Sequence, residues 1–178
     1  MDDVLTRPPR AGDWRDLHAI ASHWPTVRQM GSWPWPPQEA FTRSRSRPYD
    51  GDGFVWALEQ AGRVIGSVAI TGEELGYMLH PDAAGQGIVS RIAGAAIDHA
   101  FRQMGRRRLV ASVWEDNPAS YRVLSKLGFV HWQTAYVRGA VRYPTRSFWF
   151  RLSRDRWRTL SAPAQSTRAK INPERPGP

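Results

Sequence analysis

The stretch of sequence that decides the fold runs from Glu74 to Met104 and reads ELGYMLHPDAAGQGIVSRIAGAAIDHAFRQM. Its first six residues predict a β-strand, which Pro81 ends because proline has no backbone N–H to donate to a neighbouring strand. From Ile88 to Met104 apolar residues recur every four positions, which predicts an amphipathic helix, and Gly105 is a natural stop for it. The stretch therefore predicts a strand, a glycine turn and a helix in succession.

Two glycines, Gly85 and Gly87, lie in the turn between this strand and this helix. Glycine permits positive φ and close approach of a ligand to the backbone, and the first turn of a helix presents unpaired N–H groups. Such a turn suits a phosphate. It is not a P-loop, because the Lys-Ser/Thr ending is missing, and Ser90 stands where a dinucleotide fingerprint has its third glycine. Taken alone, the two glycines fit a plain tight turn equally well.

Further strands and helices surround this unit and predict a mixed sheet that ends in a β-hairpin. The strands are expected at 5–8, 54–59, 63–70, 108–113, 129–138 and 146–152. The helices are expected at 14–22, 38–45 and 117–128. We expect one domain over 1–160, and a disordered tail over 161–178, because the end of the chain is rich in Pro, Ser and Arg and poor in apolar residues.

Composition excludes several classes of site. The chain has 178 residues, 41% of them hydrophobic, which is enough for one core. Because there is no cysteine, a disulfide, a thiolate metal site and a cysteine nucleophile are excluded, and the five histidines are too scattered to suggest a metal site. No apolar run approaches the ~18 residues of a membrane span, and the acidic N-terminus is unlike a signal peptide. We therefore expect a cytoplasmic protein that binds no membrane and no metal.

The net charge of +9 raises the alternative of a nucleic-acid-binding protein. Lysine occurs only at Lys126 and Lys170, however, while arginine is spread along the whole chain. The dense run at 106–108 follows a predicted helix, where cations also stabilise the helix dipole. Nucleic-acid binding is thus disfavoured as the main function.

The segment from Trp24 to Pro37 is rich in Trp and Pro, and its prolines predict no regular helix before Pro37. Its tryptophans would either line a substrate cleft or cover the edge of the core. Exposed tryptophans are also compatible with a partner surface, such as that of a homodimer.

Three blocks in order carry a resemblance to a known family. They are Glu74 to Pro81, the Gly85-Gln86-Gly87 turn with its helix, and Asn117 to Phe129, which reads NPASYRVLSKLGF. With this spacing the chain resembles the GNAT superfamily of N-acetyltransferases over about 5–152, in particular the branch that includes the ribosomal-protein N-terminal acetyltransferases. The resemblance implies an α/β (α+β) fold in which about four helices flank a mostly antiparallel sheet of about six to seven strands. It also implies a splayed parallel pair, 74–79 and 108–113, at the centre.

The resemblance implies acetyl-CoA as the cofactor, lying between the two splayed strands. Its pantetheine arm would pair with the backbone of the first strand, and its pyrophosphate would rest on the amides of the glycine turn. The implied cofactor-binding residues are Met78, Leu79, Gly85, Gln86, Gly87, Ile88, Val89, Ser90, Asn117 and Ser120. Asn117 also suits the N-cap of its helix, and both roles are compatible. The chain departs from the family motif at Ala84, usually Gln or Arg, and at Val89, usually Gly or Ala; the amides survive both changes.

Many members of this family protonate the leaving thiolate with a tyrosine four residues before the Gly-Phe pair, and here that position is Leu124. The ribosomal branch shares this departure and uses a serine on the same helix, which corresponds to Ser120. Tyr121 is the second candidate, although one step along a helix turns the side chain by about 100°.

The resemblance implies direct attack of a primary amine on the thioester, which needs a base for the ammonium proton. Glu74 is the first candidate and Glu73 the second, while an ordinary exposed strand end is an equal alternative for Glu74. The expected function is an N-acetyltransferase acting on a protein N-terminus or a small molecule. The net positive charge disfavours highly cationic amines. Two alternatives stay open: a non-catalytic acyl-CoA-binding module, and an RNA- or ribosome-associated basic protein.

Overall fold

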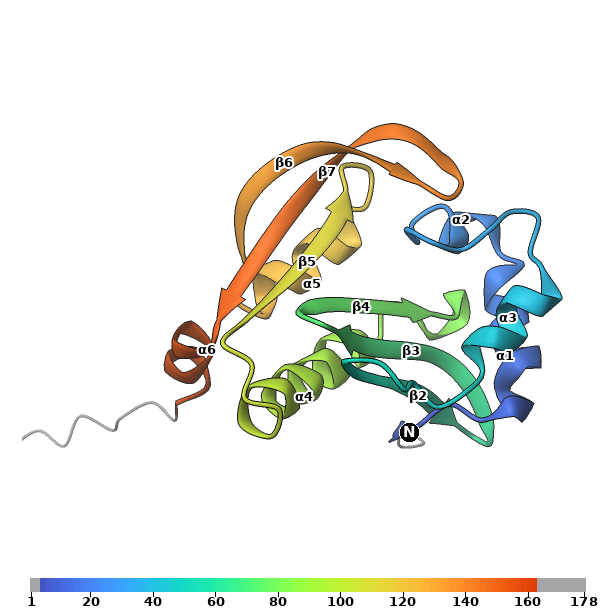
Figure 1. Cartoon of the computed structure of the whole chain (residues 1–178), viewed down its shortest axis with the longest axis horizontal. Coiled ribbons are helices and arrows are strands. Elements are labelled where there is room, and N and C mark those ends of the chain that lie inside the picture. The colour runs from blue at the N-terminus through green and yellow to red at the C-terminus, as the bar shows by residue number, and fades with distance from the viewer. Residues whose placement is uncertain (1–3, 163–178) are drawn as a thin grey trace, which may run out of the picture.

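A seven-stranded sheet forms the centre of the molecule in the computed structural model, which describes residues 4–162 (Figure 1). Its strands lie in the order β1-β2-β3-β4-β5-β7-β6. Their bounds are β1 Leu5–Arg7, β2 Gly53–Gln60, β3 Arg63–Thr71, β4 Glu74–Leu79, β5 Arg108–Trp114, β6 Val130–Gly139 and β7 Arg142–Ser153. Every neighbouring pair is antiparallel except β4 and β5, which are parallel. The mixed, mostly antiparallel sheet that the sequence predicted is confirmed.

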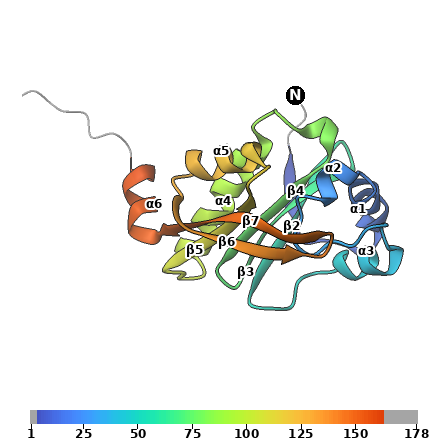
Figure 2. The same ribbon diagram turned by 90° about the horizontal axis from the view of Figure 1, so that it is seen from above.

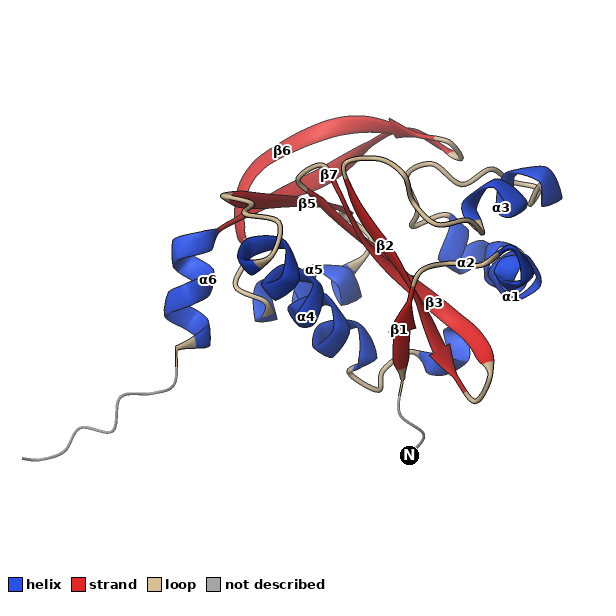
Figure 3. Ribbon diagram, turned by 60° about the horizontal axis from the view of Figure 1, so that its bottom comes forward, coloured by secondary structure: helices blue, strands red, loops and turns tan. Residues whose placement is uncertain are grey.

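Helices cover both faces of this sheet (Figures 2 and 3). Their bounds are α1 Trp14–Ala21, α2 Trp24–Val27, α3 Glu39–Arg45, α4 Ile88–Arg102, α5 Pro118–Lys126 and α6 Arg154–Ser161. In Figure 3 α1, α2 and α3 lie on one side of β2 and β3, and α4 and α5 lie on the other. Within residues 4–162, no helix has the length and apolarity to cross a bilayer.

The described chain has six α-helices, so the expectation of about four was too low. The sequence predicts no helix at α2, because prolines usually break a helix. Pro25 instead occupies the first turn of α2, where its missing N–H removes no hydrogen bond. It also missed α6, which begins where the Ser153 side chain accepts a hydrogen bond from the Arg156 amide. Apart from Ser161 and Ala162, the predicted tail lies outside the described residues.

The main core lies between α4 and the sheet. The buried residues of α4 are Ile88, Ile92, Ala93, Ala96, Ile97, Ala100 and Phe101. They pack against buried residues of the strands, including Val68, Leu109 and Leu152. This apolar face anchors α4 and thereby fixes the turn that precedes it.

The parallel strands β4 and β5 meet at one end and then diverge. Their only paired residues are Glu74 and Val110, where the Val110 amide donates to the Glu73 carbonyl at 2.8 Å. Beyond that point, along the described strands, β4 continues to Leu79 without a ladder partner in β5. The predicted splayed pair is therefore present, and it opens the sheet toward the glycine turn.

Candidate active site

Two cavities open at this divergence and meet. The turn-side cavity, of about 580 Å³, lies between the glycine turn, β4 and α5. The loop-side cavity, of about 320 Å³, lies on the sheet face formed by β3, β4 and β5, under the loop that follows α2. The two share the lining residues Gln29, Met30, Tyr77, Met78, Asn117 and Ser120. They are therefore two arms of one cleft.

The glycine turn has the backbone that the sequence predicted. Gly85 and Gly87 have φ of 78° and 73°, in the left-handed region that glycine adopts without strain. A Cβ at either position would meet nothing within 4 Å, so the conformation rather than crowding requires glycine. Both glycines line the turn-side cavity.

The N-terminus of α4 faces the same cavity. Ile88, Val89 and Ser90 line it, and no side chain of residues 4–162 caps this helix end. The first amides of a helix have no intrahelical acceptor, and the dipole of a helix of 15 residues favours an anion there. This end of the cleft can therefore bind a phosphate through main-chain donors.

Not every predicted cofactor-binding side chain reaches the cavity. Met78 and Leu79 line it, as do Ala84 and Val89, the two positions that depart from the family motif. Gln86 does not: its side chain turns back, and its Nε2 donates to the Asp82 carbonyl at 3.2 Å. Only the backbone of Gln86 belongs to the turn.

The N-terminus of α5 forms the wall where the two arms join. Asn117 caps this helix, because its side chain accepts a hydrogen bond from the Ser120 amide at 3.1 Å. Asn117 and Ser120 both line both arms of the cleft, so the cap role of Asn117 is compatible with the predicted binding role. Leu124, one turn further on, is 1% exposed and belongs to the core. Within α5, Ser120 is thus the hydroxyl that the structure brings to the junction.

Tyr121 is placed differently from Ser120. Its ring packs edge-on against Phe148 and Phe150 of β7, with centroids 5.8 and 5.0 Å apart, and it lines neither arm. Because one residue along the helix turns the side chain by about 100°, only one of the two neighbours can face the cleft.

Tyr77 was missed by the sequence reasoning and lies at the junction. Its hydroxyl donates to the Ser120 carbonyl at 3.4 Å, and it lines both arms. Burial raises the pKa of Tyr77 above its usual value, against the opposite effect of the hydrogen bond to Ser120. The hydroxyl is therefore protonated at neutral pH. Strand periodicity shows which residues share a face of β4 with Tyr77, but not which face meets α5.

The two candidate bases have different surroundings. Glu74 is exposed, lines the loop-side cavity and forms no ion pair or hydrogen bond with another side chain between 4 and 162. Glu73 forms an ion pair with Arg108 at 2.7 Å. The structure thus brings Glu74 to the cleft, and it pairs Glu73 with an arginine.

Of the two roles expected for the tryptophan-rich segment, the structure shows the lining of a cleft, by Trp33. Trp33 lines the loop-side cavity and packs edge-on against Phe41, with centroids 5.3 Å apart. Trp24 and Trp35 pack against each other instead, with centroids 5.2 Å apart, and are partly exposed.

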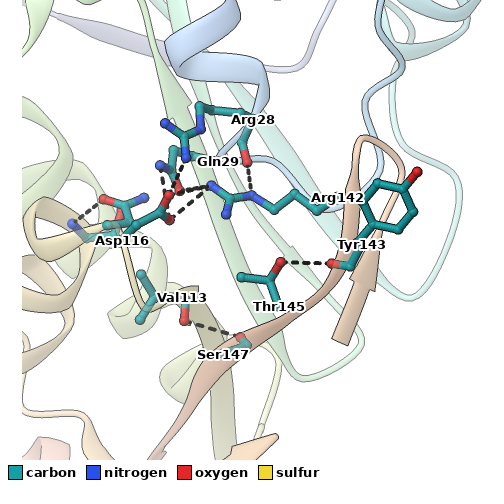
Figure 4. Close-up of polar contacts among 10 residues, drawn as sticks. Arg28, Gln29, Val113, Asp116, Arg142, Tyr143, Thr145 and Ser147 are labelled. Atoms are coloured by element: carbon teal, nitrogen blue, oxygen red, sulfur yellow. Dashed lines mark hydrogen bonds and ion pairs between the residues drawn. The ribbon is translucent and has the colours of Figure 1, made fainter. Parts of the chain in front are cut away.

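A group of four residues, the Arg142 clasp, is joined by hydrogen bonds and ion pairs (Figure 4), and one of its members, Gln29, lines the loop-side cavity. It consists of Arg28, Gln29, Asp116 and Arg142. The Arg142 side chain donates to the Arg28 carbonyl at 2.5 Å, to Gln29 Oε1 at 3.2 Å and to Asp116 Oδ1 at 2.9 Å. Arg28 also pairs with Asp116. The β6–β7 hairpin is thereby joined to the segment that follows α2.

The arginines of the clasp lower the pKa of Asp116, although this carboxyl is partly buried. Burial alone would raise the pKa of this carboxyl, but the hydrogen bonds and charge of Arg142 and the charge of Arg28 outweigh it and lower the pKa. Arg142 also lies over the ring of Trp114, 5.1 Å from its centroid, and Trp114 lines the loop-side cavity. No local pattern in the sequence predicts this group, because its members are up to 114 residues apart.

Comparison with known proteins agrees with this geometry. Residues 3–130 match the family model described as an acetyltransferase (GNAT) domain. The chain is 33% identical over 138 residues to uncharacterized N-acetyltransferase YnaD of Bacillus subtilis. The matched region covers 70% of this chain and 78% of that protein.

Solved structures share the fold. Spermidine N-acetyltransferase from Vibrio cholerae, in complex with CoA and spermine, superposes with a TM-score of 0.73 at 15% identity, over 86% of this chain and 97% of that one. Ribosomal-protein-S5-alanine acetyltransferase from Vibrio fischeri does so with a TM-score of 0.65 at 21% identity, over 88% of this chain and 99% of that one. The matched domain, the relative and the cleft lead to one conclusion: the chain belongs to the GNAT family of acyl-CoA-dependent N-acetyltransferases.

Proposed function

We propose that this protein transfers the acetyl group of acetyl-CoA to a primary amine by direct attack, at the junction of the two cavities. The observation that carries the proposal is the meeting of a phosphate-type turn and a carboxylate-bearing cavity at Ser120. In the reaction the ammonium first loses one proton to become the free amine. The amine nitrogen then bonds to the thioester carbon, the carbon–sulfur bond breaks, the nitrogen loses a second proton and the sulfur gains one, so that one proton is released to solvent overall.

The turn-side cavity suits acetyl-CoA. The left-handed turn at Gly85 and Gly87 and the uncapped start of α4 would hold the pyrophosphate through backbone donors. The β4 backbone between Glu74 and Leu79, which β5 leaves without a partner, would pair with the pantetheine arm. The cofactor supplies the activated acetyl group.

Ser120 would donate its hydroxyl hydrogen to the sulfur as negative charge develops there. The Tyr77 hydroxyl donates to the carbonyl of Ser120 and so positions the first turn of α5. With Leu124 buried in the core, the position where many family members have an acidic hydroxyl lacks one here.

Glu74 would accept the proton of the incoming ammonium, directly or through water. Its carboxylate lines the loop-side cavity and has no ion-pair partner among the described side chains, so it is available for this role. A carboxylate there also favours entry of a cationic amine by simple attraction.

Isothermal titration with acetyl-CoA tests the proposal, using Gly87→Trp to obstruct the turn-side cavity. Gly62→Trp is the matched control, because Gly62 also has a left-handed φ of 75° and open space around it but lies in the β2–β3 turn. We expect saturable binding by the wild type and by Gly62→Trp, and loss of binding in Gly87→Trp. Absence of binding by the wild type would refute the proposed site.

Turnover then separates a transferase from a non-catalytic acyl-CoA-binding module, because only the former releases CoA when an amine is added. The ribosomal branch of the family, a cytoplasmic location and a homodimer stay predictions. So does the absence of nucleic-acid binding, which salt-dependent RNA titrations would test.

A further inference from the structure

The loop-side cavity is lined by a single charged side chain, and its composition indicates which amine fits it. We infer that the acceptor is a small amine with one positive charge on an uncharged body, and that the cavity discriminates against polyamines. This inference rests on the proposed function and adds the substrate class.

The carboxylates in and near the cavity indicate how many ammonium groups a substrate can have. Glu74 is the only charged residue in its lining. The neighbouring carboxylates are already paired with arginines: Glu73 with Arg108 at 2.7 Å and Glu115 with Arg146 at 3.6 Å. A substrate ammonium therefore finds one available anionic partner.

The Arg142 clasp indicates the same limit. Asp116 is shared between Arg28 and Arg142, so this group has a net charge of +1. The Arg142 side chain is only 9% exposed, which makes exchange of this pair for a substrate ammonium costly. The clasp lies behind two lining residues of the cavity, because Gln29 belongs to it and Arg142 lies 5.1 Å from the centroid of the Trp114 ring. A second ammonium group at Gln29 and Trp114 would therefore be repelled by this charge, and at short range the repulsion is only partly screened by salt.

The rest of the lining indicates the body of the substrate. The floor of the cavity consists of small side chains on one face of the sheet, namely Ser67, Ala69, Gly76 and Ser112. Its walls include Met30, Trp33 and Trp114. A volume of about 320 Å³ lies at the lower end of the range for small-molecule sites. Aromatic rings bind both apolar groups and a cation over their faces. Because the polar residues Gln29, Asn117 and Ser147 also line the cavity, the lining suits an ammonium on a flat, uncharged body of mixed polarity.

The test uses two amines with the same body. 4-Methylbenzylamine and 1,4-bis(aminomethyl)benzene share a ring and differ by one ammonium group, and spermidine serves as the polyamine. Acetyl-CoA binding is measured on every sample, followed by amine binding to the CoA complex and kcat/KM for acetylation. For the wild type we expect the monoamine to exceed the diamine and spermidine by about tenfold in kcat/KM, which corresponds to about 1.4 kcal/mol.

A gain-of-function variant sharpens the test. Ser112→Asp adds a second carboxylate to the floor, on the sheet face that includes Glu74, and should reduce or reverse the discrimination against the diamine by about tenfold. Ala95→Asp adds the same charge on the exposed side of α4, outside the cavity, and should leave the ratio unchanged.

The outcomes distinguish a wrong substrate class from a wrong proposed function. If acetyl-CoA binds but the diamine or spermidine is used as well as the monoamine, the substrate class is wrong while the proposed function stands. The same holds if no monoamine binds, or if Ser112→Asp and Ala95→Asp give the same ratio. If acetyl-CoA itself does not bind, the proposed function fails.

Discussion

The two arms of the cleft are built in opposite ways. The turn-side cavity takes more of its lining from one continuous stretch, β4 to α4, than from any other segment, and that stretch offers backbone amides of residues such as Gly87 and Ile88. Arg122 and Lys126 of α5 add two cationic side chains to it. The loop-side cavity is formed by side chains from segments that are far apart in sequence, including Trp33, Ser112 and Ser147. A cofactor that is common to a family can be held by main chain, whereas an acceptor that differs between members needs side chains that can change.

This contrast predicts that substitutions in the two arms separate cofactor binding from acceptor use. The first three of the following experiments compare acetyl-CoA affinity with acceptor kinetics, and the fourth measures the free energy of unfolding. A variant that changes both equally would break the contrast.

The largest effect is expected from Glu74→Gln. Removing the proposed base should lower kcat/KM for the acceptor amine by about 10² to 10³, because general base catalysis contributes about 10² to 10⁴. The Kd for acetyl-CoA should change less than about twofold, as Glu74 lies outside the turn-side cavity. Glu73→Gln is the control, since its partner is Arg108, and unchanged kinetics of Glu74→Gln would remove this residue from the mechanism.

A smaller effect is expected from Arg142→Met, which removes the clasp but keeps the aliphatic stem. Loss of its hydrogen bonds should lower the free energy of unfolding by about 1 to 3 kcal/mol. It should raise KM for the acceptor more than it raises the Kd for acetyl-CoA, because Arg142 packs on Trp114, which lines only the loop-side cavity, whereas Gln29 lines both cavities. Urea unfolding and steady-state kinetics measure both effects. Arg146→Met, at an exposed pair, should be nearly neutral in the unfolding measurement.

Gly85→Ala should affect cofactor binding rather than acceptor use. A left-handed conformation costs a residue with a Cβ about 1 kcal/mol, although the added methyl group meets no neighbour. Acetyl-CoA affinity should fall several-fold with little change in acceptor KM. Gly12→Ala, where φ is not positive and space is also open, is the control for stability. Equal affinity in both variants would mean that the turn conformation does not matter for the cofactor.

Two carboxyl groups should make the free energy of unfolding depend on pH. Their effect is expected to be the smallest at neutral pH and to grow in acid. At Asp13 and Asp116 burial alone would raise the pKa, but arginine partners outweigh it and lower the pKa. A lowered folded-state pKa contributes stability above the unfolded value of about 3.9, and this is lost as pH falls through the folded value. The free energy of unfolding should therefore decrease below about pH 4. In Asp116→Asn the decrease should be shallower than in the wild type, and an identical pH profile would contradict the assignment.

The sequence predicted the features that depend on neighbouring residues. The strand 74–79, the helix from Ile88 and the left-handed turn follow from local periodicity and from glycine, so they could be read directly. The splayed pair came from the family resemblance rather than from any local pattern. The helix α2 was missed because Pro25 was judged by its usual effect and not by its position in the first turn.

The side chains of the acceptor arm could not be predicted in the same way. Ser120 and Tyr121 are adjacent in sequence, and only packing of Tyr121 against β7 decides which of them faces the cleft. The role of Arg142 depends on partners that the fold brings from α2 and from the end of β5. Nothing in the residues around Arg142 indicates those partners, because the contacts exist only after the sheet has formed.

The single pairing between β4 and β5 has a further consequence, for the integrity of the sheet. A strand without a neighbour presents unpaired N–H and C=O groups, and such an edge usually lies at the rim of a sheet, where it can recruit another chain. Here the two unpaired edges lie in the middle, at the seam between β1–β4 and β5–β7. A bound pantetheine arm would act as a missing strand and join the two halves, so ligand would protect this seam from hydrogen exchange as well as from misassociation.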